Sequence, residues 1–227
     1  GALTRCFLAI RLQQIANSLR QYRIEQVESH RKSCQEFFEA AVVSSEFSLL
    51  LDFGAHTGEQ VTQACRFMDV VAFEPDPRAF AILTKCVNYF PRGYKTPELR
   101  QCAVSTRNGV ARLGHSDVSP EKTGGSTLVS TKSGFSGANG TECETVDVLE
   151  ILNSLTSPES TILKMDIEGE EYRVLRRMMK HPHFRKLGLI FVEYHERKMR
   201  GGTYLGLLLT LQLWRRGLTR SRLIEWY

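Results

Sequence analysis

Four short acidic segments, each placed at the end of a predicted strand, hold the residues whose types and spacing could do chemistry. They cover residues 52–59, 73–77, 164–171 and 192–196. In a parallel α/β sheet, ligands bind outside the carboxyl ends of the strands. Carboxylates gathered there can accept hydrogen bonds from hydroxyl groups, remove protons or bind cations. The sequence therefore predicts a polar binding site along one edge of a sheet.

The first segment reads Asp-Phe-Gly-Ala-His-Thr-Gly-Glu, a strand end that turns through glycines into a helix. Gly54 and Gly58 let the backbone approach a ligand and accept φ angles that a Cβ disfavours. Their G-x-x-x-G spacing differs from the G-x-G-x-x-G of dinucleotide sites, and no phosphate-binding lysine of the P-loop type follows. The turn therefore disfavours a pyrophosphate ligand. As a competing interpretation, it is only a tight connection between a strand and a helix.

The second segment ends a strand in Glu74, 20 residues beyond Gly54. An acidic side chain at this place can accept hydrogen bonds from both hydroxyls of a ribose. A pocket that binds a nucleoside without phosphates, and whose acidic lining suits a cation, fits S-adenosylmethionine. The residues predicted to bind this cofactor are Asp52, Gly54, Ala55, Gly58, Glu74, Pro75, Cys102 and Ala103.

The third and fourth segments supply the predicted catalytic residues, Asp166, Glu168 and His195. Strand alternation places Asp166 and Glu168 on one side of an extended segment. A reaction at a hydroxyl group needs a base that removes the proton, and we favour Asp166 as the central residue. His195 is predicted to act as a base or as a substrate ligand, with a purely structural histidine as the alternative.

The same carboxylates, with Glu193, could form an oxygen-rich site for Mg²⁺. They could equally pair with Lys164 and nearby arginines, and the spacing does not separate the two possibilities. The prediction that we adopt assigns no metal to the site and leaves the role of Lys164 open.

The elements that must position these residues alternate between apolar runs and helical patterns. We expect a doubly wound (Rossmann-like) α/β sheet, because such alternation is typical of β-α-β units. Strands are predicted over residues 47–53, 70–73, 99–104, 110–113, 144–146, 161–165, 187–194 and 222–226. Helices are predicted over residues 58–68, 77–89, 147–155, 170–180 and 204–216, and an irregular stretch over residues 114–142.

An N-terminal extension over residues 1–45 precedes the predicted α/β domain of residues 46–227. Apolar residues at helical spacing over residues 8–22 predict a helix packed on the domain, and a second helix is expected over residues 33–44. Two heptads are too few to predict a coiled coil, so the oligomeric state is left open.

The composition places the chain among globular proteins and excludes several other classes. It has 227 residues, of which 42% are hydrophobic and 24% charged. Its apolar runs are far shorter than the roughly 20 residues that cross a bilayer. The six cysteines form no C-x-x-C pair, which favours free thiols and a reducing, cytoplasmic compartment.

The formal net charge of +5 is unevenly distributed along the chain. Residues 172–227 hold thirteen Lys or Arg and three Glu, a net charge of +10. Such a segment, with Arg215, Arg216, Arg220 and Arg222, could dock an anionic partner. We favour a solvated surface, because exposed aromatic side chains do not alternate with the basic ones.

The four acidic segments together resemble the FkbM family of S-adenosylmethionine-dependent methyltransferases. Residues 52–58, 72–75, 164–169 and 193–195 match its Asp-x-Gly-Ala-Asn-x-Gly, Ala-Phe-Glu-Pro, Lys-x-Asp-x-Glu-Gly and Glu-x-His patterns. The resemblance covers about residues 46–217, and Lys-Met-Asp-Ile-Glu-Gly is its most specific piece. His56 stands where the family has Asn, and Thr57 where an aliphatic residue is common.

The resemblance implies a class I methyltransferase fold and O-methylation of a small or sugar-containing acceptor. Methylation of an RNA ribose is the alternative enzymatic function, since the C-terminal segment is basic. A catalytically silent cofactor-binding or scaffolding protein is the alternative of another class. The presence of Asp166, Glu168 and His195 weighs against it.

Overall fold

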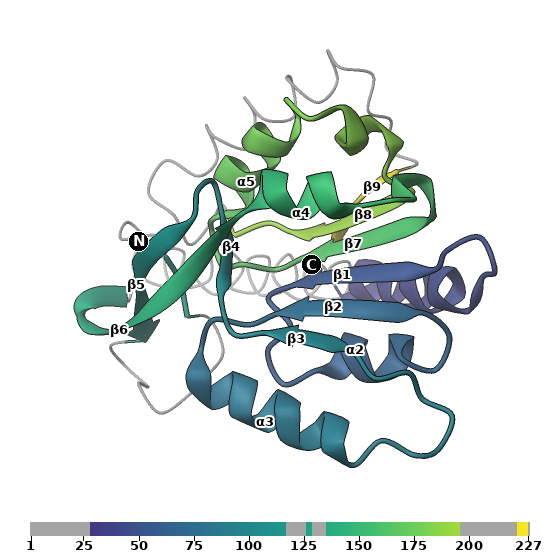
Figure 1. The fold of residues 1–227 in the computed structure, drawn as a ribbon, viewed down its shortest axis with the longest axis horizontal. Helices are drawn as coiled ribbons and strands as arrows, with labels where there is room; N and C mark the ends of the chain where they lie inside the picture. The colour runs from purple at the N-terminus through teal and green to yellow at the C-terminus, as the bar shows by residue number, and fades with distance from the viewer. Residues whose placement is uncertain (1–27, 117–125, 129–134, 196–221, 227) are drawn as a thin grey trace, which may run out of the picture.

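A computed structural model describes residues 28–116, 126–128, 135–195 and 222–226 (Figure 1). The helices predicted over residues 8–22 and 204–216 lie outside these ranges. Cys6 and the arginines Arg215, Arg216 and Arg220 lie outside them as well.

A six-stranded sheet in the order β3-β2-β1-β7-β8-β9 forms the centre of the fold (Figure 1). All five neighbouring strand pairs are parallel. The strands are β1 (Leu49–Phe53), β2 (Asp69–Phe73), β3 (Glu98–Arg100), β7 (Thr161–Met165), β8 (Leu189–Glu193) and β9 (Leu223–Trp226). Parallel sheets are covered on both faces, which explains why the central strands are nearly continuous apolar runs. The predicted Rossmann-like α/β fold is confirmed.

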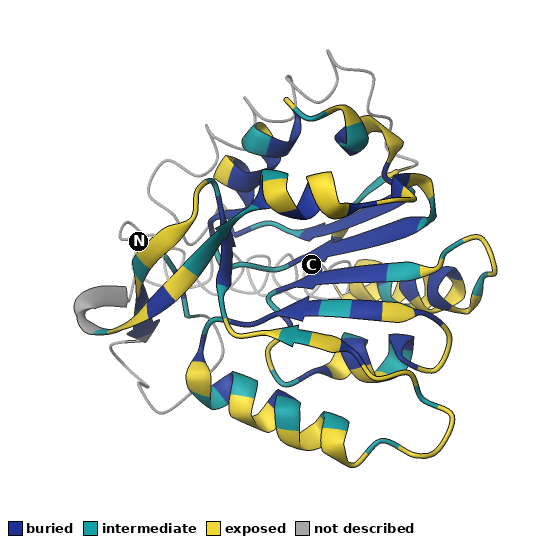
Figure 2. Cartoon of the chain, in the orientation of Figure 1, coloured by how far each residue is buried: buried dark blue, intermediate teal, exposed yellow. Residues whose placement is uncertain are grey.

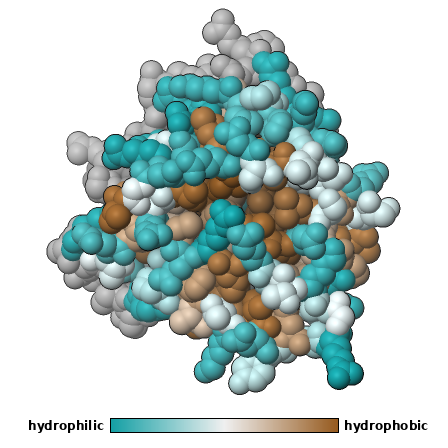
Figure 3. All heavy atoms as spheres, in the orientation of Figure 1, coloured by the Kyte–Doolittle hydropathy of each residue, from teal (hydrophilic) through white to brown (hydrophobic). Residues whose placement is uncertain are grey.

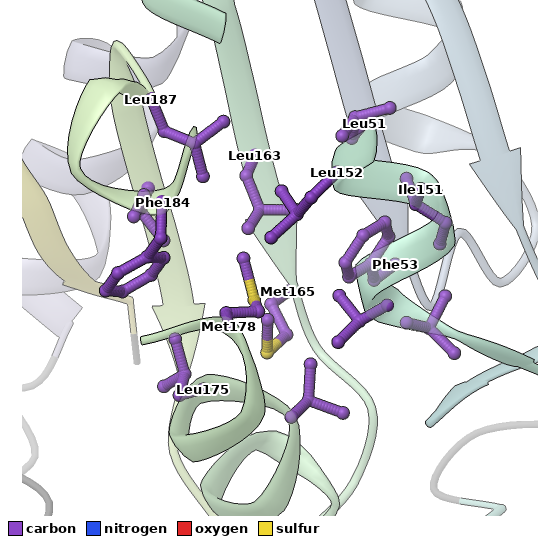
Figure 4. Close-up of a cluster of buried hydrophobic side chains, with 14 of the residues drawn as sticks. Leu51, Phe53, Ile151, Leu152, Leu163, Met165, Leu175, Met178, Phe184 and Leu187 are labelled. Carbon is purple, nitrogen blue, oxygen red and sulfur yellow. The ribbon is translucent and has the colours of Figure 1, made fainter. Parts of the chain in front are cut away.

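Strand alternation divides the core between the two faces of this sheet. Leu51 and Phe53 point to the side covered by α4 (Val148–Ser154) and α5 (Glu171–Met178), where Leu163 and Met165 join them (Figure 4). Leu50 points to the opposite side. Figure 2 shows the result: β1, β7 and β8 are buried along most of their length.

Helices α2 (Glu59–Ala64) and α3 (Pro77–Asn88) cover the second face together with a helix over residues 28–43. The helix over residues 28–43 buries Phe38 against Phe191 and Trp226, at ring-centroid distances of 5.3 Å in both cases. His30 and Cys34 contact the carbonyl oxygen of Glu225 in β9. The second predicted helix of the extension is therefore an integral part of the α/β core.

A second, three-stranded sheet in the order β4-β6-β5 differs from the sequence prediction. Its strands are β4 (Ala103–Ser105), β5 (Gly109–Ser116) and β6 (Phe135–Asp147). The single strand predicted over residues 99–104 is thus two strands in two sheets. The irregular stretch predicted over residues 114–142 is also wrong at its ends, because β5 and β6 pair there as a long antiparallel hairpin. Glycine- and serine-rich strands lack the apolar alternation that would have identified them.

Other boundaries moved by a few residues. The helix predicted over residues 58–68 shortens to α2 and begins after Gly58, and the helix predicted over residues 170–180 shortens to α5. Two short 3₁₀ helices, η1 (Pro158–Ser160) and η2 (Pro182–Lys186), precede β7 and β8.

The outer surface fits a folded domain with a covered sheet. The face drawn in Figure 3 carries its hydrophobic residues mainly in the middle, with hydrophilic residues around them. Among the described residues, none of the helices combines the length and the hydropathy that crossing a bilayer requires. The five described cysteines are free thiols.

Candidate active site

The four acidic segments meet because β2, β1, β7 and β8 are consecutive neighbours in the parallel sheet. Figure 1 shows the arrowheads of β1 and β2 pointing toward the side on which β4, β5 and β6 lie. Two adjoining cavities lie along this edge. The structure thus brings Asp52, Glu74, Asp166 and Glu193, which are far apart in the sequence, to one edge of the sheet.

The turn between β1 and α2 is shaped by positive φ angles at Gly54 (+82°), His56 (+49°) and Gly58 (+92°). A Cβ on Gly54 would lie 1.8 Å from the backbone oxygen of Asp166, so only glycine lets β1 and β7 approach here. A Cβ on Gly58 would lie 2.5 Å from Leu83 Cδ1 in α3. His56 adopts a left-handed conformation that asparagine and histidine tolerate better than most residues.

Glu74 lines the smaller cavity from the end of β2 and is only 6% exposed. Its Oε2 accepts a hydrogen bond from the His56 backbone N–H, and its Oε1 accepts one from the Asp76 N–H, both at 2.8 Å. Each carboxylate oxygen has a second lone pair, so acceptor capacity remains for a ligand. Burial raises the pKa of Glu74 to about 7, although both backbone hydrogen bonds act to lower it.

Asp76 anchors the segment of residues 126–128 beside the same cavity. Ser126 Oγ donates a hydrogen bond to Asp76 Oδ2 at 3.0 Å, and Thr127 Oγ1 donates one to the Glu168 carbonyl at 2.6 Å. Burial acts to raise the pKa of Asp76, but hydrogen bonds from Arg78 and Ser126 outweigh it and lower the pKa. The carboxylate therefore stays ionised and holds this segment against the cavity.

Lys164 and Asp52 are cross-strand partners in the register of β7 and β1. Lys164 Nζ lies 3.3 Å from Asp52 Oδ1 and 4.0 Å from Asp166 Oδ2, and it donates a hydrogen bond to the Gly54 carbonyl at 2.9 Å. Burial acts to lower the pKa of Lys164, but Asp52 and Asp166 outweigh it and raise the pKa. The Lys164 ammonium group thus connects the end of β1 to the carboxylate at the end of β7.

His195 lies among four carboxylates and is 3% exposed. Its Nδ1 is 3.0 Å from Glu171 Oε1. Its Nε2 is 3.1 Å from Glu168 Oε2, 3.7 Å from Asp166 Oδ1 and 3.9 Å from Glu193 Oε1. Burial acts to lower the pKa of His195, but Glu171, Glu168 and Asp166 outweigh it and raise the pKa.

Glu168 reaches this cluster from a strained backbone with φ of +55°. Fully buried Glu171 holds the loop, since its carboxylate accepts hydrogen bonds from the N–H groups of Ile167 (3.0 Å) and Gly169 (2.8 Å). Strained non-glycine residues concentrate at functional sites. The fold therefore sustains an unfavourable backbone conformation that directs Glu168 toward His195.

The two cavities share one wall made by Gly54, His56 and Asp166. The smaller cavity has apolar and acidic lining residues, among them Phe73, Glu74, Pro75, Ala103, Leu113 and Glu168. The larger cavity has a volume of about 670 Å³ and is bounded on its far side by the helix over residues 28–43. The arrangement suits two ligands that meet at Asp166.

The predicted site residues differ in their position relative to the two cavities. Those lining one or both cavities are Gly54, Ala55, Glu74, Pro75, Ala103, Asp166 and Glu168. Asp52 and His195 are buried behind the lining, and Gly58 is the N-cap of α2. Cys102 lies between β3 and β4 and is not among the residues that line either cavity.

Sequence reasoning did not identify the contributions of Ser126, Glu171 and the helix over residues 28–43. Glu171 lies two residues after the Lys-x-Asp-x-Glu-Gly pattern, and its burial at a helix start is a tertiary property. Arg31, Gln35 and Glu39 of the helix line the larger cavity. Their helical spacing was a usable signal, but only the packing shows which face they present.

Comparison with known proteins identifies a family over most of the chain. The model of the methyltransferase FkbM domain matches residues 52–217. Among solved structures, a methyltransferase FkbM from Methylobacillus flagellatus KT matches with a TM-score of 0.38 and 16% sequence identity. That match covers 60% of this chain and 31% of the other, so this chain spans about a third of that protein. No curated protein matches the chain.

Proposed function

We propose, for a chain that belongs to the FkbM methyltransferase family, that it transfers the methyl group of S-adenosylmethionine to a hydroxyl oxygen of a small or sugar-containing acceptor. One observation carries this proposal. Asp166 lines both the smaller, Glu74-containing cavity and the larger polar cavity. A carboxylate shared by two cavities can hold the acceptor hydroxyl against a methyl group delivered from the other side.

The smaller cavity fits the adenosine part of this cofactor. Glu74 has a lone pair on each oxygen left to accept hydrogen bonds from the ribose hydroxyls. Leu113 and Leu128 offer apolar surface to the adenine ring. Gly54 and Asp166, whose backbones pack closely on each other, both line this cavity.

The larger cavity is the proposed acceptor site. Its volume of about 670 Å³ lies within the range of roughly 300 to 1,000 Å³ that small-molecule sites occupy. Charged and amide side chains such as Arg31, Gln35 and Glu39 line it, and such groups form hydrogen bonds with hydroxyl-rich molecules.

In this proposal, Asp166 orients and deprotonates the acceptor where the two cavities meet. When bound, S-adenosylmethionine supplies an electrophilic methyl group on a positively charged sulfur. Asp166 orients the acceptor hydroxyl and takes its proton as the new O–C bond forms and the S–C bond breaks, the electron pair staying on sulfur. The side chain of Asp166 is 29% exposed while its Oδ1 is buried, so Oδ2 is the oxygen that can meet the acceptor.

A screen with methyl-labelled S-adenosylmethionine tests the function. We expect label in the hydroxyl groups of sugars or small hydroxylated metabolites, recovered as methyl ethers that resist mild base. Label found only in RNA ribose would reassign the acceptor. Cofactor binding without transfer to any of these classes would support a silent binding protein and contradict the proposal.

A further inference from the structure

We propose that Asp166, Glu168 and His195 bind a divalent transition-metal ion beside the two cavities. The three residues each offer one ligand atom, and these atoms lie within 4.8 Å of one another. Two ligands about 2.1 Å from one ion are separated by roughly 3 to 4.2 Å. The distances from His195 Nε2 to Glu168 Oε2 (3.1 Å) and Asp166 Oδ1 (3.7 Å) fall in this range.

The orientation of His195 is the first independent observation. Nδ1 faces the carboxylate of Glu171, an acceptor, so this nitrogen carries a hydrogen and the other nitrogen is left for the cluster. Histidines that bind metals almost always donate their second N–H to a carboxylate or carbonyl. Glu171 is itself fixed by two backbone N–H groups and has no exposed surface. The chain thus contains the positioning residue that such a ligand needs.

Unsatisfied polar atoms are the second observation. Within the described part of the chain, His195 Nε2 and Asp166 Oδ1 are buried and have no hydrogen-bond partner. An unsatisfied buried polar atom costs about 1 to 3 kcal/mol. Both atoms face the same small space, where Glu168 Oε2 also points. A cation there would satisfy both unpartnered atoms at once.

The charge of the site favours a divalent ion. Its carboxylates are Asp52, Asp166, Glu168, Glu171 and Glu193, and its cationic groups are Lys164, His195 and, acting on Glu193 from the helix over residues 28–43, Arg31. A histidine that binds a metal through Nε2 is neutral, so the five carboxylates then exceed the two remaining cations by three charges. One divalent ion compensates most of that excess.

The ligand set points to Mn²⁺, Fe²⁺ or Zn²⁺ rather than to Mg²⁺. Mg²⁺ prefers oxygen ligands, whereas imidazole favours the later transition metals. The structure therefore replaces the Asp166, Glu168 and Glu193 set considered from the sequence with one that includes a nitrogen ligand. The proposal also departs from the sequence prediction that the site holds no metal.

Open coordination positions would face the ligand cavities. Asp166 and Glu168 line the smaller cavity, and three protein ligands leave places for water or substrate. This step rests on the proposed function. An acceptor hydroxyl bound at an open position of the metal ion would lose its proton more readily, while Asp166 Oδ2 remains turned toward the larger cavity.

The test is a titration of the intact chain with Mn²⁺, without cofactor, followed by the electron paramagnetic resonance signal of free Mn²⁺. We expect one bound Mn²⁺ per chain. Glu168→Gln, whose side chain is partly exposed, should lower the affinity about 10- to 100-fold, the scale reached when even supporting groups of metal sites are changed. Glu170→Gln is the matched control, because Glu170 instead bonds Ser105 and Arg173 and should leave the affinity unchanged.

Two further measurements keep the outcome unambiguous. Co²⁺ should show visible absorption bands that change in His195→Gln, and circular dichroism should establish that each variant is folded. Absence of Mn²⁺ binding, or an equal loss in Glu168→Gln and Glu170→Gln, would overturn the proposal. If equimolar Mg²⁺ displaced Mn²⁺, the site would prefer oxygen ligands, and this result would exclude His195 as a ligand. Mn²⁺ binding without S-adenosylmethionine binding would instead contradict the proposed function and leave the metal site standing.

Discussion

At the scale of single residues, the site depends on carboxylates whose behaviour is set by burial. Glu74 follows β2 and Asp166 follows β7, and the environments of the two carboxylates differ. Glu74 is 6% exposed and its pKa is raised to about 7, whereas Asp166 lies at an open junction between cavities. Their roles in binding and in proton removal therefore separate experimentally.

Affinity for S-adenosylmethionine should depend on pH through Glu74. In the proposed function the ionised carboxylate accepts two ribose hydrogen bonds, whereas the protonated form would lose part of this capacity. With a pKa of about 7, the ionised fraction and the affinity should rise about tenfold between pH 6 and pH 8. Calorimetric titration across this range checks it. Glu74→Gln should bind S-adenosylmethionine more weakly, by roughly 1 to 3 kcal/mol, and its affinity should no longer change with pH. An unchanged pH dependence in this variant would assign that dependence to another group.

Asp166→Asn should separate turnover from cofactor binding. The substitution keeps the size of the side chain and removes its basicity, so turnover should fall by about 10² to 10⁴. Affinity for the cofactor should stay close to that of the unmodified chain, because the proposed function assigns the ribose contacts to Glu74. Both quantities are measured on one preparation with the acceptor identified by the labelling screen. Undiminished turnover would exclude Asp166 as the base and shift attention to Glu168.

At the scale of elements, the turn after β1 determines how closely β1 and β7 approach at the site. Gly54 combines a φ of +82° with a Cβ position only 1.8 Å from the Asp166 carbonyl oxygen. The backbone of the segment over residues 52–59 is thus packed directly on that of the segment over residues 164–171. Asp166 is placed by this contact as much as by its own strand.

Gly54→Ala should damage both stability and activity. A left-handed conformation costs an alanine about 1 to 2 kcal/mol, and relief of the clash must move backbone atoms. We expect a loss of unfolding free energy above about 2 kcal/mol, measured by urea denaturation, together with loss of turnover. Gly93→Ala is the control, since its φ is also positive (+95°) but a Cβ there would contact nothing within 4 Å. Equal losses in the two variants would show that conformational strain alone matters.

The elements also show where sequence patterns stop being informative. The central strands were predictable because apolar runs of five residues bounded by turns specify buried parallel strands. The division of residues 99–104 between β3 and β4 was not, since a run of apolar residues carries no record of which sheet each half joins. The polar hairpin of β5 and β6 was missed at its outer end because its strands there lack apolar alternation.

At the scale of the whole molecule, ligand binding should stabilise the folded chain. A ligand present at 100 times its dissociation constant, and bound only by the folded state, adds about 2.7 kcal/mol of unfolding free energy. For a chain of this size, that corresponds to a rise in Tm of roughly 5 to 11 °C. S-adenosylmethionine should produce this shift in thermal denaturation and Glu74→Ala should reduce it. A comparable shift with NAD, and none with S-adenosylmethionine, would refute the cofactor assignment.

The helix over residues 28–43 is packed on the α/β core although it lies outside the residues that match the family. It precedes residue 52, where the match begins, yet it lines the larger cavity and buries Phe38 against β8 and β9. The predicted boundary at residue 45 therefore divides a structural unit. Selection of the acceptor is expected to involve this helix, because it supplies the far wall of the proposed acceptor site.

The sequence by itself determined the class of sheet, the strand ends that carry carboxylates, and the family. These features are local: they depend on runs of apolar residues, on glycines that permit a turn, and on short motifs. Only the tertiary structure decided that Glu171 orients His195, that Lys164 pairs with Asp52, and that Asp166 stands between two cavities. Such relations arise from strand order, register and packing, which bring together residues separated by 24 positions in one case and by more than a hundred in another, and leave no mark on local sequence.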